Sequence, residues 1–290
     1  MRFYYLIQSM RPVQWTKNLL VFAGLIFAEK LGDSNLVRLA LQAFVVFCLL
    51  SSSVYLINDV LDRERDREHP LKRMRPVASG KLRPGFCVFT AVVFILISGL
   101  WAFRLGGQFM LVGAVYLVLN LLYTTWLKHV VIIDVMSVAL GFVLRVLAGT
   151  AAIDVVTSPW ILICTFLLSL FLAFGKRRHE LLLLENQAST HRFVLEHYDP
   201  YFLDQMISVV TPSTLVCYTL YTLSPDTVAH VGSSNLLYSV PFVIYGIFRY
   251  LYLIHKKRGG GDPTQVLLSD RSLLAAILCW LVVVTLVLYH

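Results

Sequence analysis

Long apolar stretches separated by shorter polar connections run from Trp15 to Tyr289. A helix needs about 20 mostly apolar residues to cross the hydrocarbon core of a bilayer, and the pattern predicts nine such helices in an all-α, polytopic membrane protein. None of the polar connections is large enough to fold alone, so we expect one integral domain over residues 1–290. The expected spans lie near residues 13–30, 36–57, 86–104, 108–127, 130–153, 158–175, 202–223, 235–254 and 272–289.

The composition excludes an ordinary water-soluble domain. Hydrophobic residues make up 58% of the chain and charged residues 14%, whereas soluble domains carry about 45–50% and about 25%. The chain therefore needs lipid as its solvent. We expect the lipid bilayer as a partner and no nucleic acid.

Basic residues divide unevenly between the two sides of the predicted bundle. Of the 25, 20 are predicted on one side and three on the other. Because cationic connections are retained in the cytoplasm, we expect a cytoplasmic N-terminus and active site, and a C-terminus on the far side. Long polar connections follow the second and sixth spans, so two related four-helix halves would bring them together over a central, cytoplasm-facing cavity.

The second predicted span ends in a cluster of acids. Asn58, Asp59, Asp62 and Asp66 follow the pattern N-D-x-x-D-x-x-x-D, which places the three aspartates on one face if the helix continues. Carboxylates that converge at a cavity need a cation, and hard oxygen ligands suit Mg²⁺ shared with substrate phosphates. The alternative is a solvated segment beside the membrane, because arginines alternate with the acids.

Two motifs and the predicted spans carry a family resemblance. The run from Asn58 to Lys81 and the N-terminal pattern Arg11-Pro12-x-Gln14-Trp15-x-Lys17-Asn18 resemble the UbiA superfamily of intramembrane prenyltransferases. The resemblance covers most of the chain. It implies a UbiA-like all-helical bundle, a magnesium-diphosphate site made by cytoplasmic helix ends, and a lateral opening through which a polyprenyl chain enters from the bilayer.

The chain departs from the commoner pattern of that superfamily after its sixth predicted span. Typical aromatic prenyltransferases carry a second aspartate-rich motif there, whereas this chain reads Gly175-Lys176-Arg177-Arg178-His179-Glu180-Leu181. Lys and Arg bind phosphate oxygens directly, so the ligands should carry extra phosphate. The combination resembles the branch that transfers phosphoribosyl from phosphoribosyl diphosphate to a polyprenyl phosphate. It implies a magnesium-dependent transferase in a bacterial inner membrane that supplies cell-envelope glycan synthesis.

The resemblance and the charge pattern together assign roles to residues. We expect Asn58, Asp59, Asp62 and Asp66 to bind Mg²⁺, and Asp59, Asp62 and Lys176 to act directly in catalysis. No general base is required, because a polyprenyl phosphate is already ionised near neutral pH and its oxygen can attack the ribose C1. The expected contacts to the two substrates are Lys17, Asn18, Lys72, Arg73, Arg75, Tyr123, Lys128, Arg145, Arg177, Glu180 and Arg249.

Several of these residues have simpler interpretations. Arg145 falls in the middle of an apolar span, where an arginine costs at least about 2.5–3.5 kcal/mol unless it is paired, and a salt bridge with Asp134 or with another helix would satisfy it. Lys176 and its basic neighbours are also typical of cytoplasmic anchoring, and an aromatic belt explains Tyr123 equally well. The glycine-rich segment at residues 259–262 either closes over the site or is an ordinary loop.

Two other functions stay open at this point. A prenyltransferase that uses a polyprenyl diphosphate and an aromatic acceptor would need the second acidic motif that this chain lacks. A non-catalytic carrier of lipid phosphates would explain the basic connections but not the acidic motif. The acceptor's isoprenoid length leaves no readable pattern, and the sequence is compatible with a homo-oligomer as well as with a monomer.

Overall fold

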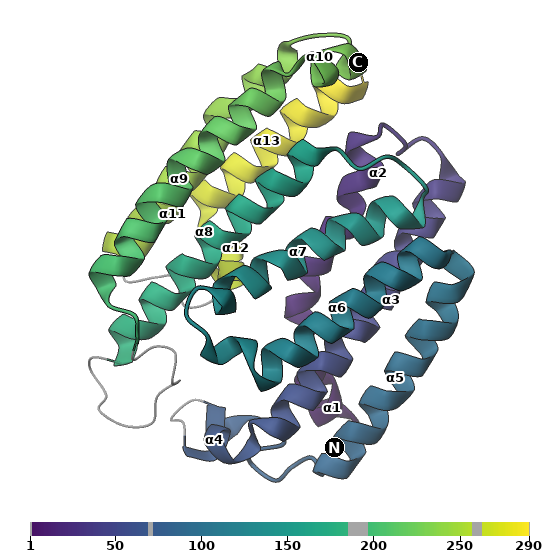
Figure 1. Cartoon of the computed structure of the whole chain (residues 1–290), viewed down its shortest axis with the longest axis vertical. Helices are drawn as coiled ribbons and strands as arrows, with labels where there is room; N and C mark the ends of the chain where they lie inside the picture. Colours follow the sequence, from purple (N-terminus) through teal and green to yellow (C-terminus); the bar gives the residue numbers. More distant parts are fainter. Residues whose placement is uncertain (1, 69–71, 185–196, 257–262, 290) are drawn as a thin grey trace. The chain divides into compact units, whose positions relative to one another are not determined.

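A computed structural model describes residues 2–68, 72–184, 197–256 and 263–289 of the chain. Within these ranges every regular element is a helix (Figure 1), which confirms the all-α prediction. Eight segments of the described chain are long and apolar enough to cross a membrane. They are α3 (Ser34–Leu61), α5 (Pro84–Leu105), α6 (Gly107–Thr125), α7 (Ile133–Ala152), α8 (Pro159–Leu184), α9 (Pro200–Leu223), η5 (Asn235–Ser239) continued by α11 (Val240–Lys256), and α13 (Arg271–Tyr289).

The first predicted span, near residues 13–30, has a different form. It folds as a 3₁₀ helix, η1 (Pro12–Phe22), followed by the short α-helix α2 (Ala23–Phe27). This segment is not among the eight candidate spans, so the prediction of nine is not confirmed. A 3₁₀ helix rises about 2.0 Å per residue against about 1.5 Å for an α-helix, which gives the two elements a combined length of about 30 Å. Its role as a ninth span therefore stays a prediction.

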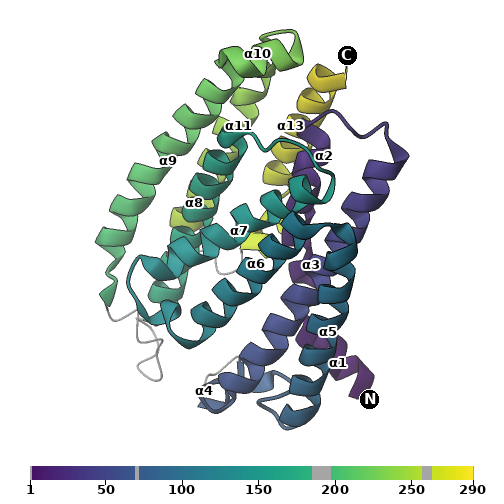
Figure 2. The same cartoon turned by 45° about the vertical axis from the view of Figure 1, so that its right-hand side comes forward.

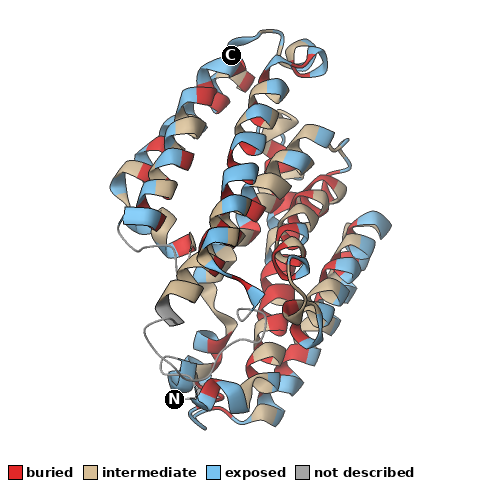
Figure 3. Ribbon diagram, turned by 60° about the vertical axis from the view of Figure 1, so that its left-hand side comes forward, coloured by how far each residue is buried: buried red, intermediate tan, exposed pale blue. Residues whose placement is uncertain are grey.

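Large apolar side chains lie on the outside of the candidate spans. On α5, Phe89, Leu96, Leu100 and Phe103 are each more than 60% exposed. Figure 3 shows exposed stretches along the helices and not only at their ends. Soluble proteins rarely expose contiguous apolar surface of this kind, whereas helices with satisfied backbone groups are suited to lipid. The chain is an integral membrane protein.

The described residues form two compact units. Unit 1 contains residues 1–130 and 144–156, and unit 2 contains residues 131–143 and 157–290. The boundary between the units therefore falls inside α7. The expectation of one integral domain over residues 1–290 stays a prediction.

Unit 1 is built around α3, along which α5 packs (Figures 1 and 2). Its core centres on Phe47, whose ring lies 6.0 Å from that of Phe109 and 5.1 Å from that of Tyr116. Gly149 on the second half of α7 lets η1 approach at backbone distance, because a Cβ there would lie 1.8 Å from the carbonyl oxygen of Val21. The 3₁₀ segment is thus packed directly against a membrane helix.

Unit 2 packs α8 against α9 and α11 against α13 (Figure 2). Within its core the ring of Phe171 lies 5.3 Å from that of Tyr250. A Cβ at Gly175 would lie 2.8 Å from Cδ1 of Ile254, so α8 and α11 approach closely at this glycine. The basic run of α8 begins at the next residue, Lys176.

Candidate active site

The acidic motif lies where α3 ends and the short helix α4 (Arg63–Glu68) begins. Asp59, on the last turn of α3, is 2% exposed and accepts hydrogen bonds from Arg11 at 2.5 Å and from Arg75 at 3.4 Å. Arg75 also donates to Asp66 at 2.7 Å. One guanidinium therefore joins two of the three aspartates that the sequence pattern singles out.

The third aspartate has a cation of its own. The carboxylate of Asp62 accepts a hydrogen bond from Nζ of Lys128 at 2.7 Å. Lys128 lies on the short 3₁₀ helix η3 (Leu127–His129) after α6 and is 6% exposed. Because a buried ammonium is costly unless it is paired, the contact with Asp62 accounts for its burial better than snorkelling to the membrane surface does.

Arg11 was not predicted as an individual site residue, although it opens the N-terminal motif. It joins α1 (Arg2–Met10) to η1 in a left-handed backbone conformation, with φ 55° and ψ 64°. Residues other than glycine adopt this conformation at a cost and keep it where the surroundings require it, often at functional sites. Its guanidinium also lies 4.9 Å from the centre of the Tyr55 ring, so ring and carboxylate together fix its position.

The end of α3 carries oxygen ligands of the kind that Mg²⁺ prefers. The side-chain oxygen of Asn58 is buried and has no hydrogen-bond partner in the described part of the chain, which is costly unless a ligand satisfies it. Among the described residues, no three His, Cys, Asp or Glu side chains converge closely enough to hold a metal ion. The donor types therefore fit a divalent cation, but the aspartates are at present turned to basic partners.

A second polar cluster joins η1 to the candidate spans of unit 1. Arg145 on α7 is 6% exposed, and it donates from Nε to Oδ1 of Asn18 and from a terminal nitrogen to the Tyr116 hydroxyl, both at 2.8 Å. Asn18 in turn donates to Oγ of Ser51 at 3.1 Å. The carboxylate of Asp134, the partner considered from the sequence, pairs instead with a residue of unit 2. Asn18 and Arg145, both expected at the substrate, thus contact each other.

In unit 2, a buried carboxylate organises the basic run of α8. Arg177 is 4% exposed and donates to Asp134 at 2.7 Å and to Glu180 at 2.6 Å. Asp134 also accepts a hydrogen bond of 2.8 Å from the hydroxyl of Tyr198, which itself accepts one from the backbone N–H of Ile132 at 2.7 Å. Burial, reinforced by the neighbouring carboxylate, raises the pKa of Tyr198 well above its ordinary value. Tyr198 therefore stays protonated and donates to Asp134.

Lys176 and Arg249 are the other predicted cations of unit 2. The side chain of Lys176 is 40% exposed, and its ammonium lies 3.9 Å from Glu180, one helical turn away. Arg249 donates to both carboxylate oxygens of Asp270, at 3.1 Å and 2.8 Å. Because of this two-point pairing, Arg249 holds α11 to the start of α13. In the basic run of α8, Lys176 has a more exposed side chain than Arg177 and Arg178, so it is the cation of this run that a ligand can reach most easily.

The four remaining candidates lie on three different elements. Lys72 and Arg73 are exposed on the 3₁₀ turn η2, and Lys17 and Tyr123 are half-buried on η1 and α6. The glycine-rich segment at residues 259–262 lies outside the described residues. The expectation that basic residues of unit 2 serve the acidic motif of unit 1 stays a prediction.

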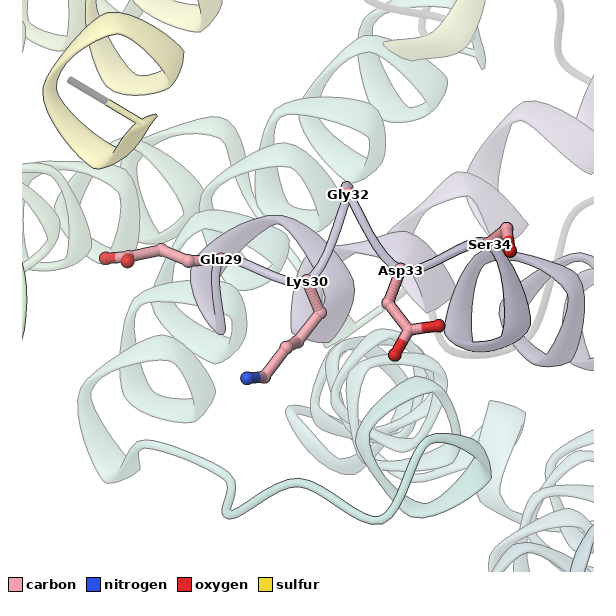
Figure 4. Close-up of a pocket in the computed structure, with 5 residues that line it drawn as sticks. All are labelled: Glu29, Lys30, Gly32, Asp33 and Ser34. Atoms are coloured by element: carbon pink, nitrogen blue, oxygen red, sulfur yellow. The ribbon is translucent and has the colours of Figure 1, made fainter.

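A surface cavity of unit 1 is separate from the acidic motif. It has a volume of about 530 Å³ and opens at the connection between α2 and α3. Figure 4 shows that Lys30 and Asp33 point to the same side, whereas Glu29 points away from them. Asp33 begins α3 by accepting a hydrogen bond from the backbone of Asn35 at 2.9 Å, and Asp59 lies about 39 Å further along the helix at about 1.5 Å per residue. The cavity is at the opposite end of α3 from the site.

These observations define the class of protein, namely a polytopic membrane protein with a carboxylate and cation site where a membrane helix ends. The model of the UbiA prenyltransferase family matches residues 18–269. The chain belongs to the UbiA prenyltransferase family.

Relatives of known name align over nearly the whole chain. The decaprenyl-phosphate phosphoribosyltransferase of Mycolicibacterium smegmatis is 36% identical over 95% of this chain and 90% of its own length. The enzyme of the same name from Corynebacterium glutamicum is 36% identical, over 98% and 86% respectively. A solved structure of a UbiA homologue from Archaeoglobus fulgidus, bound to GPP and Mg²⁺, has a TM-score of 0.72 and 16% identity over 99% of this chain and 100% of that chain. The UbiA-like fold predicted from the sequence is confirmed.

Proposed function

We propose that the chain transfers the 5-phosphoribosyl group of phosphoribosyl diphosphate to a polyprenyl phosphate such as decaprenyl phosphate, and releases diphosphate. The observation that carries this proposal is the 36% identity to two decaprenyl-phosphate phosphoribosyltransferases over nearly full length. The charge inventory of the described residues agrees with it. One acidic motif is surrounded by basic residues, and the run at Lys176 is basic where a prenyl diphosphate enzyme would need more acids.

Asn58, Asp59, Asp62 and Asp66 are the residues that would hold Mg²⁺. The side-chain oxygen of Asn58, which is buried and has no hydrogen-bond partner among the described residues, supports this role. When bound, the metal neutralises charge on the diphosphate and assists its departure. The fold neighbour bound to Mg²⁺ is consistent with a divalent ion in this family. The metal dependence of this chain remains part of the proposal.

The basic residues bind and orient the two substrates. Arg11, Arg75 and Lys128 are close enough to the acidic motif to contact the diphosphate, where cations stabilise the charge that builds up as it leaves. Lys176 and its neighbours bind the donor's 5-phosphate or the acceptor phosphate. Holding both substrates in one orientation brings the acceptor oxygen to the ribose C1.

The reaction needs no proton transfer from the protein. An ionised oxygen of the polyprenyl phosphate forms a bond to C1, the bond from C1 to the diphosphate oxygen breaks, and the electron pair leaves with the diphosphate. In-line displacement inverts C1. The product is a lipid-linked phosphoribose, a precursor suited to cell-envelope glycan synthesis such as arabinan.

The acidic motif and the N-terminus face the cytoplasm in this proposal, because 20 of the 25 basic residues are predicted on the same side. The bacterial source of the named relatives favours a bacterial inner membrane. This orientation gives the site access to a soluble, charged donor, while the acceptor's isoprenoid chain remains in the bilayer.

A transfer assay tests the function. Membranes that contain the chain are incubated with Mg²⁺, decaprenyl phosphate and phosphoribosyl diphosphate labelled in the ribose, and the lipid is extracted. We expect label in the lipid phase, dependent on the acceptor. Label that never enters the lipid, or transfer of a prenyl group to an aromatic acceptor in a parallel assay, would overturn the proposal. Movement of unmodified lipid phosphate across vesicles without reaction would indicate a carrier instead.

A further inference from the structure

The acidic motif of unit 1 is balanced in charge. Its three aspartates contact three cations among the described residues, and the closest contacts within the pairs are 2.5–2.7 Å. Asp59, Asp66 and Lys128 are all buried. The pairs are Asp59 with Arg11 and Arg75, Asp66 with Arg75, and Asp62 with Lys128.

This balance restricts what can bind. A divalent cation that entered alone would take carboxylates from their partners and leave the buried Lys128 and the partly exposed Arg11 and Arg75 without counter-charges, which is unfavourable and most costly at Lys128. A diphosphate that entered alone would place its negative charges beside the aspartates. When both enter, the carboxylates turn to the metal and the cations turn to phosphate oxygens, so every buried charge keeps a partner.

We infer that the site binds the divalent ion and the diphosphate as one unit, and that Arg11, Arg75 and Lys128 exchange carboxylate partners for phosphate oxygens when this unit arrives. The inference deepens the proposed function, on which it rests. It assigns Arg11, absent from the sequence-based candidates, to the diphosphate. It also predicts that the site binds a bare metal ion weakly, because the same three cations occupy the carboxylates.

Lys128 provides the sharpest test, because among the described residues it is the one basic side chain that pairs with Asp62. Removal of its charge leaves Asp62 available to a metal ion and removes one phosphate contact. Lys128→Gln should therefore strengthen the binding of a bare divalent ion and weaken the binding of diphosphate. A merely structural role would weaken both or change neither.

The experiment uses the full chain in nanodiscs, with Mn²⁺ as the metal and methylene bisphosphonate, a diphosphate that cannot be cleaved. Free Mn²⁺ is measured by electron paramagnetic resonance with and without the bisphosphonate. Because coupling between two ligands is reciprocal and typically amounts to about 5–150-fold, we expect each ligand to strengthen the binding of the other by at least about tenfold. In Lys128→Gln this coupling should fall several-fold, with affinity for bare Mn²⁺ rising.

Two further variants make the result specific. Lys30→Gln removes the same charge from the exposed connection at the other end of α3 and should leave both affinities unchanged. Lys128→Arg keeps the charge and should restore most of the coupling. Thermal unfolding of each variant identifies any that fails to fold, in which case Arg11→Gln is measured in place of Lys128→Gln.

The inference is overturned if bare Mn²⁺ binds as tightly as it does with the bisphosphonate, or if Lys128→Gln weakens both ligands in a folded protein. These outcomes differ from a failure of the proposed function. A chain that couples Mn²⁺ to the bisphosphonate but transfers no label from phosphoribosyl diphosphate would retain the inference about the site while refuting the choice of donor.

Discussion

Lys128 donates a hydrogen bond of 2.7 Å to Asp62, a residue that precedes it by 66 positions in the chain. The contact joins η3, which follows α6, to the end of α3 within unit 1. Together with Arg11 and Arg75, it gives each aspartate of the acidic motif a cation. The most acidic segment of the chain is therefore a neutral site in three dimensions, and its affinity for metal and phosphate depends on both sets of charges.

Loss of Asp62 should remove transfer, and it should lower stability without preventing folding because the buried Lys128 loses its partner. We expect Asp62→Ala to lower the rate of lipid labelling by at least about a hundredfold, the usual scale for loss of one group that stabilises developing charge. Glu64→Ala is the matched control, because Glu64 is exposed and contacts only surface arginines among the described residues, and surface ion pairs contribute about 0–1 kcal/mol. Magnesium-dependent transfer by Asp62→Ala at the normal rate would contradict the assignment.

Reversal of charge at Lys176 should weaken phosphate binding. We expect Lys176→Glu to raise the KM for phosphoribosyl diphosphate or for the lipid phosphate by about tenfold or more, since an attractive contact becomes a repulsive one. Lys256→Glu, at the exposed end of α11, makes the same charge change and should have a small effect. Steady-state kinetics with each substrate varied in turn gives the KM of both variants for both substrates. Equal KM values for the two variants would remove Lys176 from the site.

Arg145 should support the fold even when no substrate is present. Arg145→Met leaves the Asn18 oxygen and the Tyr116 hydroxyl without their charged donor, and each buried polar group left unpaired costs about 1–3 kcal/mol. We expect a lower midpoint of thermal unfolding in detergent. Arg104→Met, at the exposed end of α5, should unfold like the parent chain. Unchanged unfolding of Arg145→Met together with lost substrate affinity would support the purely substrate-binding role instead.

Gly149 should not tolerate a side chain. Gly149→Ala would place a methyl group against the carbonyl of Val21, and such overpacking costs typically about 1–3 kcal/mol. At Gly113 the nearest atom to a new Cβ is a leucine methyl at 3.6 Å, an ordinary contact, so Gly113→Ala should be nearly neutral. Thermal unfolding of the two alanine variants compares them directly, and equal midpoints would refute the close approach of η1 to α7.

Tyr198 should stabilise unit 2 to the same extent at neutral and at mildly alkaline pH. Burial raises its pKa in the folded chain above the unfolded value of about 10, so the stabilisation by the neutral hydroxyl is complete below about pH 10 and is lost only as the pH rises through the folded pKa. Tyr198→Phe should cost about 1–3 kcal/mol at both pH 6 and pH 9, whereas Tyr201→Phe, at an exposed position, should cost little. A cost that vanishes by pH 9 would show that the hydroxyl ionises earlier than the structure implies.

The sequence predicts most of this fold because a membrane span is a local property of about 20 residues. The eight candidate spans coincide with eight of the predicted stretches. The stretch near residues 13–30 is the exception, since Lys17 and Asn18 interrupt it and a 3₁₀ helix leaves little trace in composition. Asn18 is buried there because a partner on α7, far along the chain, reaches it.

The sequence predicts less of the site than of the fold, because the contacts of the site join residues that are far apart in the chain. The aspartates after α3 stand out as a motif, but Arg11 contacts Asp59 across 48 positions, and no spacing rule reveals such a pair. Arg145 is recognisable as a costly residue in an apolar span, but the sequence does not show that it contacts an amide on η1 and a hydroxyl on α6. The carboxylate of Asp134 is instead satisfied by Arg177 and Tyr198.

The winding of η1 determines which of its residues reach the protein interior. With three residues per turn, Trp15, Asn18 and Val21 recur on one side, where Trp15 donates to Ser52 at 3.1 Å and Asn18 meets Arg145. An α-helix turns about 20° less per residue, so relaxation of this segment to the commoner form would rotate Val21 by about 120° relative to Trp15 and separate it from Gly149. A single inserted or deleted residue between these positions would have the same effect, which makes this stretch intolerant of changes in length.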